Sequence, residues 1–533
     1  MEIAKIKKIL KDHGQEHLLK YFDELDIKQQ DHLIRQIMDI DFDEINELYQ
    51  LTKKKSKTKG SNIKPLPAET NIKSEWIKLG KKLIKAGKYA VITLAGGQGT
   101  RLGFNGPKGT FILKEINKSL FEIQCDQLKD MHQKYGVYVN WFIMTSHENH
   151  DATIKFFEEN NYFNYPKDKI TFFKQGLLPM LHTNGKIIMD AKDNIKLGPN
   201  GQGGSFKALI EHGIIKKLEK EKVAYVFIGG IDNILQPINN PALIGYTKAE
   251  KLLSASISVF KNYPEEKVGV FAYQDDKPSI IEYINIGDEL AHQKDDNGNL
   301  VYADANIVSH LFDIKVFKEL KDKPLPYHVA FKKCDYLDGS GKLKSPKKEN
   351  AYKFECFIFD IFPYIDRIGV LRLNRSKVFA PIKNKDGIDS PASAIKLYKA
   401  AKKQKPIIMI ISLIIATALM LWYLWLYFDM LKTADICRTP TLGQFPIGIK
   451  LLFLLLVSPI GVSSGILTHL LTKNKSGRDL YQSRLKLLTI ILFIITPIII
   501  FIFGRFSLIW CIIPILPILL LMIYNGVRYL MRN

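Results

Sequence analysis

Cysteine is scarce in this sequence, with five residues among 533, and no two of them form a C-x-x-C pair. This scarcity argues against a disulfide framework and against a zinc site, and it is typical of a protein in a reducing compartment. The N-terminus lacks a charged segment followed by an apolar stretch, and begins instead with the amphipathic sequence MEIAKIKKILKDHGQEHLL. We therefore do not expect a cleaved signal peptide.

Charged residues are nearly absent from the last quarter of the chain. Residues 406–533 contain 11 Lys and Arg and 3 Asp and Glu, whereas the whole sequence contains 76 and 54. Four apolar stretches of this tail approach or exceed the ~20 residues that cross a bilayer. The pattern predicts an all-α transmembrane tail, with a buried hydrophobic helical domain as the alternative. The four predicted spans are residues 406–428, 445–471, 487–503 and 506–524.

The placement of positive charges favours one orientation of these spans. Lysines precede the first span and a basic cluster lies between the second and third, whereas the opposite loops hold few positive charges. By the positive-inside rule we expect a multi-pass membrane protein, in contact with membrane lipid, whose two termini and front domain face the cytoplasm. The net charge of +22 would also suit a nucleic-acid partner. No nucleic-acid motif is recognisable, so none is predicted.

The front of the chain has the pattern of a globular α/β protein. Residues 1–60 repeat apolar side chains at helical spacing and end in the linker KKKSKTKGSN, which predicts an N-terminal helical part. Over residues 61–335, apolar runs such as YAVITLAGG and VAYVFIGG alternate with helical stretches. This alternation predicts an α/β domain with a largely parallel sheet.

A glycine-rich segment, LAGGQGTRLG at 94–103, directly follows the first of these apolar runs, and GPKGT follows at 106–110. Glycines let a backbone approach phosphates, and Arg101 and Lys108 could neutralise a triphosphate. The glycine spacing differs from that of dinucleotide-binding loops, and the Walker ending Gly-Lys-Ser/Thr is missing. A plain turn after a strand is the alternative, which the accompanying Arg and Lys disfavour.

The glycine-rich segment with its following PKG resembles the nucleotide-binding loop of eukaryotic-type UDP-sugar pyrophosphorylases, most closely the UDP-N-acetylglucosamine pyrophosphorylases. The resemblance covers about residues 1–400. It implies a Rossmann-like nucleotidyltransferase sheet with a helical N-terminal part and a small C-terminal part, which we place at 336–405, ahead of the tail at 406–533. Further segments that carry it, in order, are FFKQGLLP (172–179), GPNGQGGSFKAL (198–209), IDNIL (231–235), ANIVSHLF (305–312) and FAPIKNKDG (379–387).

The resemblance implies an enzyme that transfers a uridylyl group from UTP to a hexose-1-phosphate, with N-acetylglucosamine-1-phosphate as the expected acceptor, and releases pyrophosphate. Two polyanions must meet in this reaction, so catalysis should depend on positioning and charge neutralisation. Asp232 follows an apolar strand, where open α/β sheets bind ligands, and its carboxylate suits Mg²⁺ as the cofactor. A turn-forming aspartate is the alternative. By resemblance the catalytic residues are Arg101, Lys108 and Lys383.

The resemblance also implies two sets of substrate contacts. The amide of Gln175 can both donate to and accept from a base edge, which suits recognition of uracil. Phe357 and Phe359, which alternate along a predicted strand, either line a pocket for the acyl group or belong to the core. The implied nucleotide-binding residues are Leu94, Ala95, Gly96, Gly97, Gly99, Thr100, Gln175, Gly176, Gly203 and Gly204, and the implied sugar-binding residues are Gln202, Glu282 and Asn306.

One departure from the family pattern concerns the sugar. The usual Gly-Asn-Gly-Gly-Leu-Tyr reads Gly-Gln-Gly-Gly-Ser-Phe at 201–206, and Gln202 is one methylene longer than the Asn it replaces. A UDP-glucose or broad-specificity UDP-sugar pyrophosphorylase is therefore the alternative enzyme. A non-catalytic membrane protein that senses UDP-sugar is the alternative of another class. The tail lies outside the resemblance; we expect it to anchor the protein, and an unknown membrane glycosyltransferase partner stays open.

Overall fold

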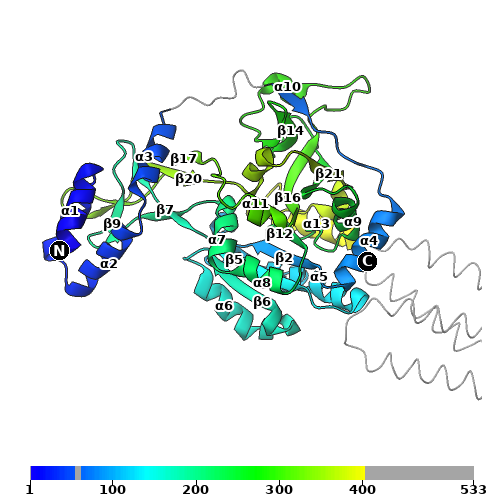
Figure 1. Cartoon of the computed structure of the whole chain (residues 1–533), viewed down its shortest axis with the longest axis horizontal. Helices are drawn as coiled ribbons and strands as arrows, with labels where there is room; N and C mark the ends of the chain where they lie inside the picture. Colours follow the sequence, from blue (N-terminus) through cyan, green and yellow to red (C-terminus); the bar gives the residue numbers. More distant parts are fainter. Residues whose placement is uncertain (1, 54–61, 403–533) are drawn as a thin grey trace, which may run out of the picture. The chain divides into compact units, whose positions relative to one another are not determined.

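Apolar runs that the sequence predicts as strands form the centre of the fold. The structure is a computed structural model that describes residues 2–53 and 62–402, all of which lie in the first of the chain's two units, residues 1–403. Four parallel strands lie side by side in the order β12-β2-β5-β6 (Figure 1). Their bounds are Tyr225–Gly230, Tyr89–Leu94, Asn140–Thr145 and Ile170–Lys174.

Six further strands make this ten-stranded sheet mixed, not largely parallel as expected. The long strand β16 (Asp304–Asp313) runs antiparallel to β12 and also pairs with β13 and β14. Antiparallel strands are common additions to a sheet whose other strands are parallel. The remaining strands are β13 (Ser254–Phe260), β21 (Ile368–Arg372), β14 (Val270–Gln274), β15 (Lys277–Ile281) and β1 (Ile63–Pro65).

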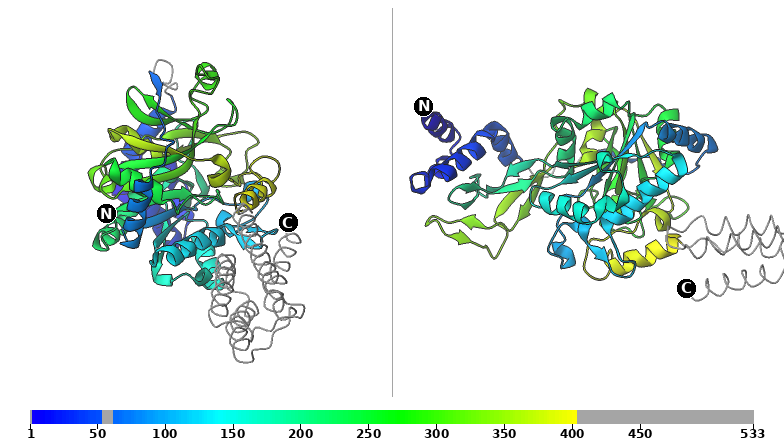
Figure 2. Two further views of the ribbon diagram at one scale, coloured as in Figure 1. Left: turned by 90° about the vertical axis from the view of Figure 1, so that its right-hand side faces the viewer. Right: turned by 90° about the horizontal axis from the view of Figure 1, so that it is seen from below.

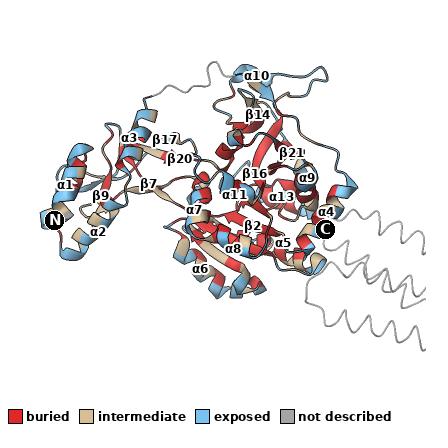
Figure 3. Ribbon diagram, in the orientation of Figure 1, coloured by how far each residue is buried: buried red, intermediate tan, exposed pale blue. Residues whose placement is uncertain are grey.

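Consecutive side chains of the central strands point to opposite faces and enter two separate cores. Val91 and Trp141 belong to one buried cluster, whereas their neighbours Ile92 and Phe142 belong to the other. Both faces of these strands are therefore buried, as the continuous apolar runs predict (Figure 3). The first core includes α4 (Ser74–Lys85), α5 (Leu120–Tyr135), α6 (His150–Glu159) and α9 (Pro241–Ala249), and the second includes α7 (Ser205–Glu211), α8 (Ile214–Lys220) and α11 (Lys315–Glu319).

The N-terminal helices α1 (Glu2–Asp12), α2 (Ile27–Met38) and α3 (Phe42–Leu51) share a third core with short strands from the middle of the chain. Figure 2 shows these helices beyond the edge of the main sheet. The start of α2 is set locally, because Asp26 accepts from the Gln29 amide at 2.9 Å while the Gln29 side chain accepts from the Asp26 amide at 3.1 Å. Such a capping box satisfies N–H groups that the first turn leaves free.

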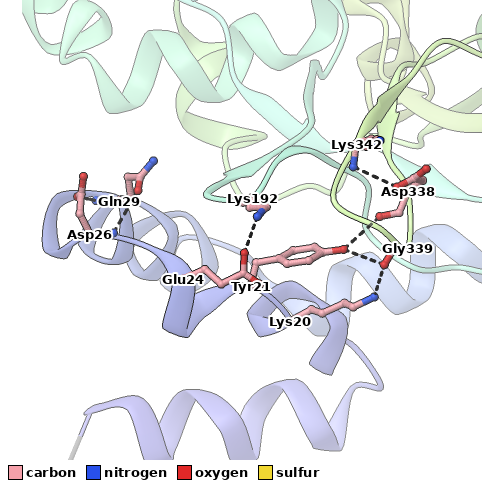
Figure 4. A network of polar contacts seen from close by, with 9 residues as sticks. All are labelled: Lys20, Tyr21, Glu24, Asp26, Gln29, Lys192, Asp338, Gly339 and Lys342. Atoms are coloured by element: carbon pink, nitrogen blue, oxygen red, sulfur yellow. Dashed lines mark hydrogen bonds and ion pairs between the residues drawn. The ribbon is translucent and has the colours of Figure 1, made fainter.

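Polar contacts join these helices to a distant turn (Figure 4). The Tyr21 hydroxyl donates to the carbonyl of Gly339 at 3.0 Å, and the Lys20 ammonium donates to the same carbonyl at 2.6 Å. Lys192 also pairs with Glu24. These contacts hold together residues more than 160 positions apart. They fix the N-terminal helices against the short strands from later in the chain.

The short strands form small separate sheets, and a few short helices complete the described fold. The predicted subdivision into residues 1–60, 61–335 and 336–405 stays a prediction. The short sheets are β17-β20-β8 (His328–Lys332, Ala351–Glu355, Leu181–His182), β11-β7 (Leu197–Pro199, Leu177–Pro179), β10-β9 (Asn194–Ile195, Met189–Ala191), β18-β19 (Tyr336–Leu337, Leu343–Lys344) and β3-β4 (Ile112–Leu113, Lys118–Ser119). The short α-helices are α10 (Asp288–His292) and α12 (Arg375–Val378), and α13 (Pro391–Lys402) follows them.

The structure corrects the predicted multi-pass membrane localisation. Within residues 2–53 and 62–402, no helix is long and apolar enough to cross a bilayer. The longest helix of this part, α5, has 16 residues, which is short of the ~20 that a span requires. The four predicted spans, at 406–428, 445–471, 487–503 and 506–524, lie outside the described residues. The described part of the chain thus gives no support to membrane residence, lipid contact or cytoplasmic termini.

Candidate active site

The glycine-rich loop folds back on itself at the carboxyl end of β2. Leu94 is the last residue of β2, and the loop then turns so that the Gly99 amide donates to the Gly106 carbonyl at 2.9 Å. The Lys108 amide donates to the Gly97 carbonyl at 3.0 Å, which brings Lys108 beside the first glycines. A Cβ on Gly99 would lie 2.5 Å from the Phe104 ring, so only glycine fits there. Ala95, Gly96, Gly97 and Thr100 belong to the same turn.

Four charged residues from three separate sequence segments interact around Lys108. Burial lowers the pKa of the Lys108 ammonium, Asp232 opposes this effect, and the positive charges of Lys383 and Arg101 lower it further. The structure therefore brings together the four charged residues that the sequence predicts for phosphate chemistry. Arg101 itself is exposed, whereas Lys108 is partly buried.

Hydrogen bonds of the Asn233 side chain explain how the segment that carries Lys383 is held beside Asp232. The buried Asn233 side chain donates to the Val378 carbonyl at 2.8 Å and accepts from the Ala380 amide at 2.9 Å. Directly beside it, the Ile382 amide donates to the Asp232 carbonyl at 2.9 Å. The segment that ends at Lys383 is thus fixed along the turn that carries Asp232. Asn233 was not among the predicted site residues, although it stands next to one.

A second carboxylate lies near this turn and was also not predicted. The Lys383 amide donates to the Asp389 carbonyl at 2.6 Å. Burial raises the pKa of the Asp389 carboxyl, which Lys383 opposes, and Asp232 is among the charges that act on it. The sequence signal for Asp389 is weak, because an acidic residue in a polar loop has no distinguishing pattern.

The donor set at Asp232 fits Mg²⁺ that is held largely by substrate. Among residues 2–53 and 62–402, no group of three or more His, Cys, Asp or Glu side chains is arranged to hold a metal. Mg²⁺ binds through one or two carboxylates, waters and substrate phosphates and needs no cage of protein ligands. Asp232 therefore provides the residue type that such an ion requires, while a protein-held structural metal does not fit the described part of the chain.

The predicted nucleoside contacts meet at the ends of β5 and β6. The backbone N–H of Gln175 donates to the Thr145 carbonyl at 2.8 Å, and a Cβ on Gly96 would lie 2.8 Å from Gln175 Oε1. The side-chain amide of Gln175 therefore lies against Gly96 of the glycine-rich loop. A base that bound there would lie between this loop and the segment that carries Gln175. Its side chain is buried, so its orientation is restricted.

Asn200 occupies the space that Gly176 and Gly204 leave open. A Cβ on Gly176 would lie 2.5 Å from Asn200 Nδ2, and one on Gly204 would lie 2.1 Å from Asn200 Oδ1. Asn200 Oδ1 is buried without a hydrogen-bond partner, as is the neighbouring Ser205 hydroxyl. Buried polar atoms are normally paired, so these two atoms mark a place where a ligand could bind. The glycines were predicted from the sequence, whereas the asparagine that requires them was not.

The 201–204 turn is fastened to the segment that carries Phe357. Gly203 donates to the Cys356 carbonyl at 2.8 Å, and the Cys356 amide donates to the Asn200 carbonyl at 2.9 Å. A Cβ on Gly201, whose φ is +87°, would lie 2.4 Å from the Cys356 carbonyl oxygen. Gln202 is consequently held next to residues 356 and 357. Phe357 and Phe359 do not alternate along a strand as expected, because β20 ends at Glu355 and a 3-10 helix begins at Ile358.

The sugar side of the site is built around Gly269. A Cβ on Gly269 would lie 2.9 Å from Glu282 Oε1, and the Asn306 amide donates to the Gly269 carbonyl at 2.8 Å. Glu282 and Asn306, two of the three predicted sugar contacts, are therefore neighbours. Burial raises the pKa of the Glu282 carboxyl, and the charges that act on it include His328, Asp360 and Lys383.

A histidine–aspartate pair that the sequence did not reveal supports this side. His328 Nε2 lies 3.0 Å from Asp360 Oδ1, and the Phe357 amide donates to Asp360 Oδ2 at 2.6 Å. Burial alone would lower the pKa of His328, but Asp360 and the further carboxylates of Glu282 and Glu355 outweigh it and raise that pKa. The His328 ring packs 4.6 Å from the Phe357 ring, which in turn stacks 5.1 Å from the Phe359 ring.

Comparison with known proteins gives consistent matches over this region. The family model described as UTP–glucose-1-phosphate uridylyltransferase matches residues 40–405. A protein of Dictyostelium discoideum called probable UDP-N-acetylglucosamine pyrophosphorylase is 36% identical over 408 residues, which cover 72% of this chain and 84% of the relative. The UDP-N-acetylglucosamine pyrophosphorylase of Saccharomyces cerevisiae is 34% identical over 422 residues, covering 74% of this chain and 88% of the relative.

A solved structure agrees with these matches. The crystal structure of the uridine diphosphate N-acetylglucosamine pyrophosphorylase of Trypanosoma brucei, in complex with an inhibitor, superposes with a TM-score of 0.63 at 28% identity. The superposition covers 79% of this chain and 90% of that one. The α/β nucleotidyltransferase fold predicted from the sequence is thereby confirmed.

Proposed function

The chain belongs to the UTP–glucose-1-phosphate uridylyltransferase family, and from this premise we propose that it makes UDP-N-acetylglucosamine. In this proposal a Mg²⁺-dependent reaction joins the uridylyl group of UTP to N-acetylglucosamine-1-phosphate and releases pyrophosphate. The mutual electrostatic influence of Arg101, Lys108, Asp232 and Lys383, together with the hydrogen bond from the Ile382 amide to the Asp232 carbonyl, carries the proposal, because transfer between two polyanions needs such a cluster.

The proposed chemistry is a displacement at the α-phosphorus of UTP. A phosphate oxygen of the sugar phosphate forms a bond to this phosphorus, the bond to the bridging oxygen breaks, and pyrophosphate leaves with the electron pair. Lys108 and Arg101 neutralise the triphosphate, and Lys383 holds the phosphate of the sugar substrate. No covalent intermediate with the protein is required, so catalysis comes from alignment and charge stabilisation.

Mg²⁺ bound at Asp232 and at phosphate oxygens would supply further positive charge to the transferring group. The protein's own part is to keep the Asp232 carboxylate within electrostatic reach of Lys108, so that a cation and an ammonium can face the same phosphates. The pairing of the Ile382 amide with the Asp232 carbonyl supports this arrangement, because it holds Lys383 in register with the carboxylate.

The identity of the sugar depends on the other side of the site. Glu282 and Asn306 offer one acceptor and one amide to sugar hydroxyls, and the partly buried ring of Phe357, stacked on the core residue Phe359, offers an apolar surface for an acetyl group. The relatives described above carry the name UDP-N-acetylglucosamine pyrophosphorylase, which favours the same nucleotide sugar here. Gln202 favours the second candidate, a UDP-glucose or broad-specificity pyrophosphorylase, because its longer side chain alters the sugar contacts.

The test is pyrophosphate release by the full chain from UTP and Mg²⁺ with a panel of sugar phosphates. We expect the highest kcat/KM with N-acetylglucosamine-1-phosphate and a lower value with glucose-1-phosphate. Equal values would favour the broad-specificity alternative. Binding of UDP-sugar without turnover of any sugar phosphate would contradict the enzyme proposal and indicate a sensor. Asp232→Asn is the control for metal-dependent turnover, and Asp276→Asn, on the exposed surface, is its matched counterpart.

A further inference from the structure

Gln236 is a fully buried glutamine in the loop that follows β12, four residues after Asp232. Its side chain makes three hydrogen bonds. Nε2 donates to the Val308 carbonyl at 2.7 Å, while Oε1 accepts from Asn233 Nδ2 at 2.8 Å and from the Ser309 hydroxyl at 3.0 Å. A Cβ on Gly229 would lie 2.0 Å from Gln236 Nε2, so the backbone of β12 approaches the amide closely. The side-chain amide therefore lies in a tight, buried position in which both of its polar atoms are hydrogen-bonded.

The contact with Asn233 ties Gln236 to the phosphate side of the site. Asn233 is the residue that holds the Val378–Ala380 segment, and through it Lys383, against the Asp232 turn. Its Nδ2 atom divides its two donors between Val378 and Gln236. A change at residue 236 that removed this acceptor would leave a buried donor of Asn233 unpaired, which is unfavourable.

The contact with Val308 ties Gln236 to the sugar side. Val308 has a φ of +52°, which is unfavourable for a β-branched residue. It lies in an irregular part of β16 where one residue of β13 faces three, between the pairs Ser256–His310 and Ser258–Asn306. Strained backbone of this kind persists only where its surroundings hold it, and it is concentrated at functional sites.

Asn306 and Gln236 hold the two ends of this strained residue. The Val308 amide donates to Asn306 Oδ1 at 2.9 Å, while its carbonyl accepts from Gln236. Because Oδ1 of Asn306 is engaged, a ligand would meet this side chain as a donor through Nδ2. The direction of that donor therefore depends on the irregular stretch of β16 around Val308, which we call the Asn306 bulge. This bulge in turn is held by Gln236.

We infer that Gln236 is a positioning residue that holds the Asp232–Lys383 turn and the Asn306 bulge in one geometry, so that the sugar phosphate is bound at its phosphate and at its ring together. This inference rests on the proposed uridylyltransferase reaction. Gln236 acts through Asn233 and Val308 and need not touch the substrate. It connects two parts of the chain, 233 and 308, that no local sequence pattern relates.

The experiment compares Gln236→Leu with the wild-type full chain in steady-state pyrophosphate release. Because a misplacement of about 1 Å can reduce rates about 100-fold, we expect kcat/KM for the sugar phosphate to fall about 10- to 100-fold, with a raised KM. The KM for UTP should change less than about threefold, since the glycine-rich loop keeps its own contacts. Gln15→Leu is the matched control: Gln15 is also buried and bonded to Gly185 and Ile187, but it lies in the N-terminal core.

A second variant separates positioning from general loss of stability. Gln236→Glu keeps the oxygen that accepts from Asn233 and Ser309 but turns a carboxylate oxygen toward the Val308 carbonyl. Protonation at low pH restores a donor there, so its kcat/KM relative to wild type should rise as pH falls, while the Gln236→Leu ratio stays flat. If Gln236→Leu does not fold, the pH dependence of Gln236→Glu relative to the wild type tests the inference by itself.

Three outcomes would overturn the inference. They are a wild-type KM for sugar phosphate in Gln236→Leu, the same rise in KM in Gln15→Leu, or a flat pH ratio for Gln236→Glu. An inactive wild-type protein would instead contradict the proposed function itself, so the two failures can be told apart.

Discussion

The phosphate side and the sugar side of the site are built in different ways. On the phosphate side, one continuous loop places Lys108 through its own backbone bonds to Gly97, and the charged residues act over several ångströms. On the sugar side, Glu282, Asn306 and the His328–Asp360 pair come from separate segments of the chain and depend on short, directional contacts. Charge neutralisation tolerates small displacements better than hydrogen bonding does. We therefore expect catalysis to be lost through the first region and selectivity to be changed through the second.

The largest effect is expected at Asp232. Asp232→Asn removes the carboxylate that would bind Mg²⁺ while keeping the shape, and kcat should fall about 1000-fold, as when a preorganised charge contact is lost. Wild-type activity should also vanish with chelator and return with added Mg²⁺. Pyrophosphate release checks both, with Asp276→Asn unchanged. Full activity of Asp232→Asn would show that no metal needed for turnover is bound by Asp232 on the phosphate side.

A loss of about 100-fold or more in kcat is expected for Lys108→Met. Because burial lowers the pKa of Lys108, its ammonium loses its charge at a lower pH than an ordinary lysine. Wild-type activity should therefore decline on the alkaline side, and Lys108→Arg should keep whatever activity it has to higher pH. The pH dependence of kcat measures this. Lys155→Met, on the exposed face of α6, is the control and should match the wild type.

An intermediate effect is expected at Gly204. Gly204→Ala places a Cβ 2.1 Å from Asn200 Oδ1, so either the turn or the asparagine must move. Overpacking of this kind destabilises by about 1–3 kcal/mol, and the KM for UTP should rise about tenfold, as expected when a positioning contact shifts. Thermal unfolding and KM are the measurements. Gly339→Ala, whose Cβ would meet only Lys20 Nζ at 4.0 Å, should leave both unchanged.

A smaller effect, on selectivity and not on rate, is expected for Gln202→Asn. Removing one methylene from a contact to the sugar should change the ratio of kcat/KM for N-acetylglucosamine-1-phosphate and glucose-1-phosphate by about tenfold. The maximal rate with the preferred sugar should stay within about threefold, because the phosphate side is untouched. A change in rate with no change in the ratio would show that residue 202 does not read the sugar.

The smallest effect on turnover is expected for the His328–Asp360 pair. Since the pKa of His328 is raised in the folded protein, the pair stabilises the fold fully below the unfolded pKa of His, ~6.5, and less as pH rises through the folded value. Asp360→Asn should therefore destabilise most at acid pH and least at alkaline pH. Thermal unfolding between pH 5 and pH 9 measures this, and equal destabilisation across that range would contradict the assignment.

The glycine-rich loop was predictable because its residues are neighbours in sequence. Glycines, Arg101 and Lys108 fall within fifteen positions, and the strand that precedes them is marked by its apolar run. Asn200, Asn233 and Gln236 were not predictable. Each is a common polar residue in a loop, and its importance comes from the distant backbone that it bonds or that leaves room for it.

The pairing and direction of the strands in the sheet were not predictable from the sequence either. Apolar runs indicated its strands, but a run does not say which neighbour it pairs with or in which direction. The antiparallel placement of β16 between β12 and β13 makes the sheet mixed, and it produces the irregular stretch at Val308. The membrane prediction relied on apolar stretches and on the placement of positive charges, and no helix of the described part of the chain bears it out.

By itself the sequence indicated the reaction class through the ordered motifs that resemble those of a known family. It also indicated the residue types that meet the phosphates and the strands that end beside them, because these depend on local pattern and on charge. The tertiary structure decided which separated residues share a contact: Lys383 beside Asp232, Asn200 between two glycines, and Gln236 between Asn233 and Val308. Hydrogen bonds require their partners within about 3 Å. Contacts of that range between distant positions arise only when the sheet has brought its loops together.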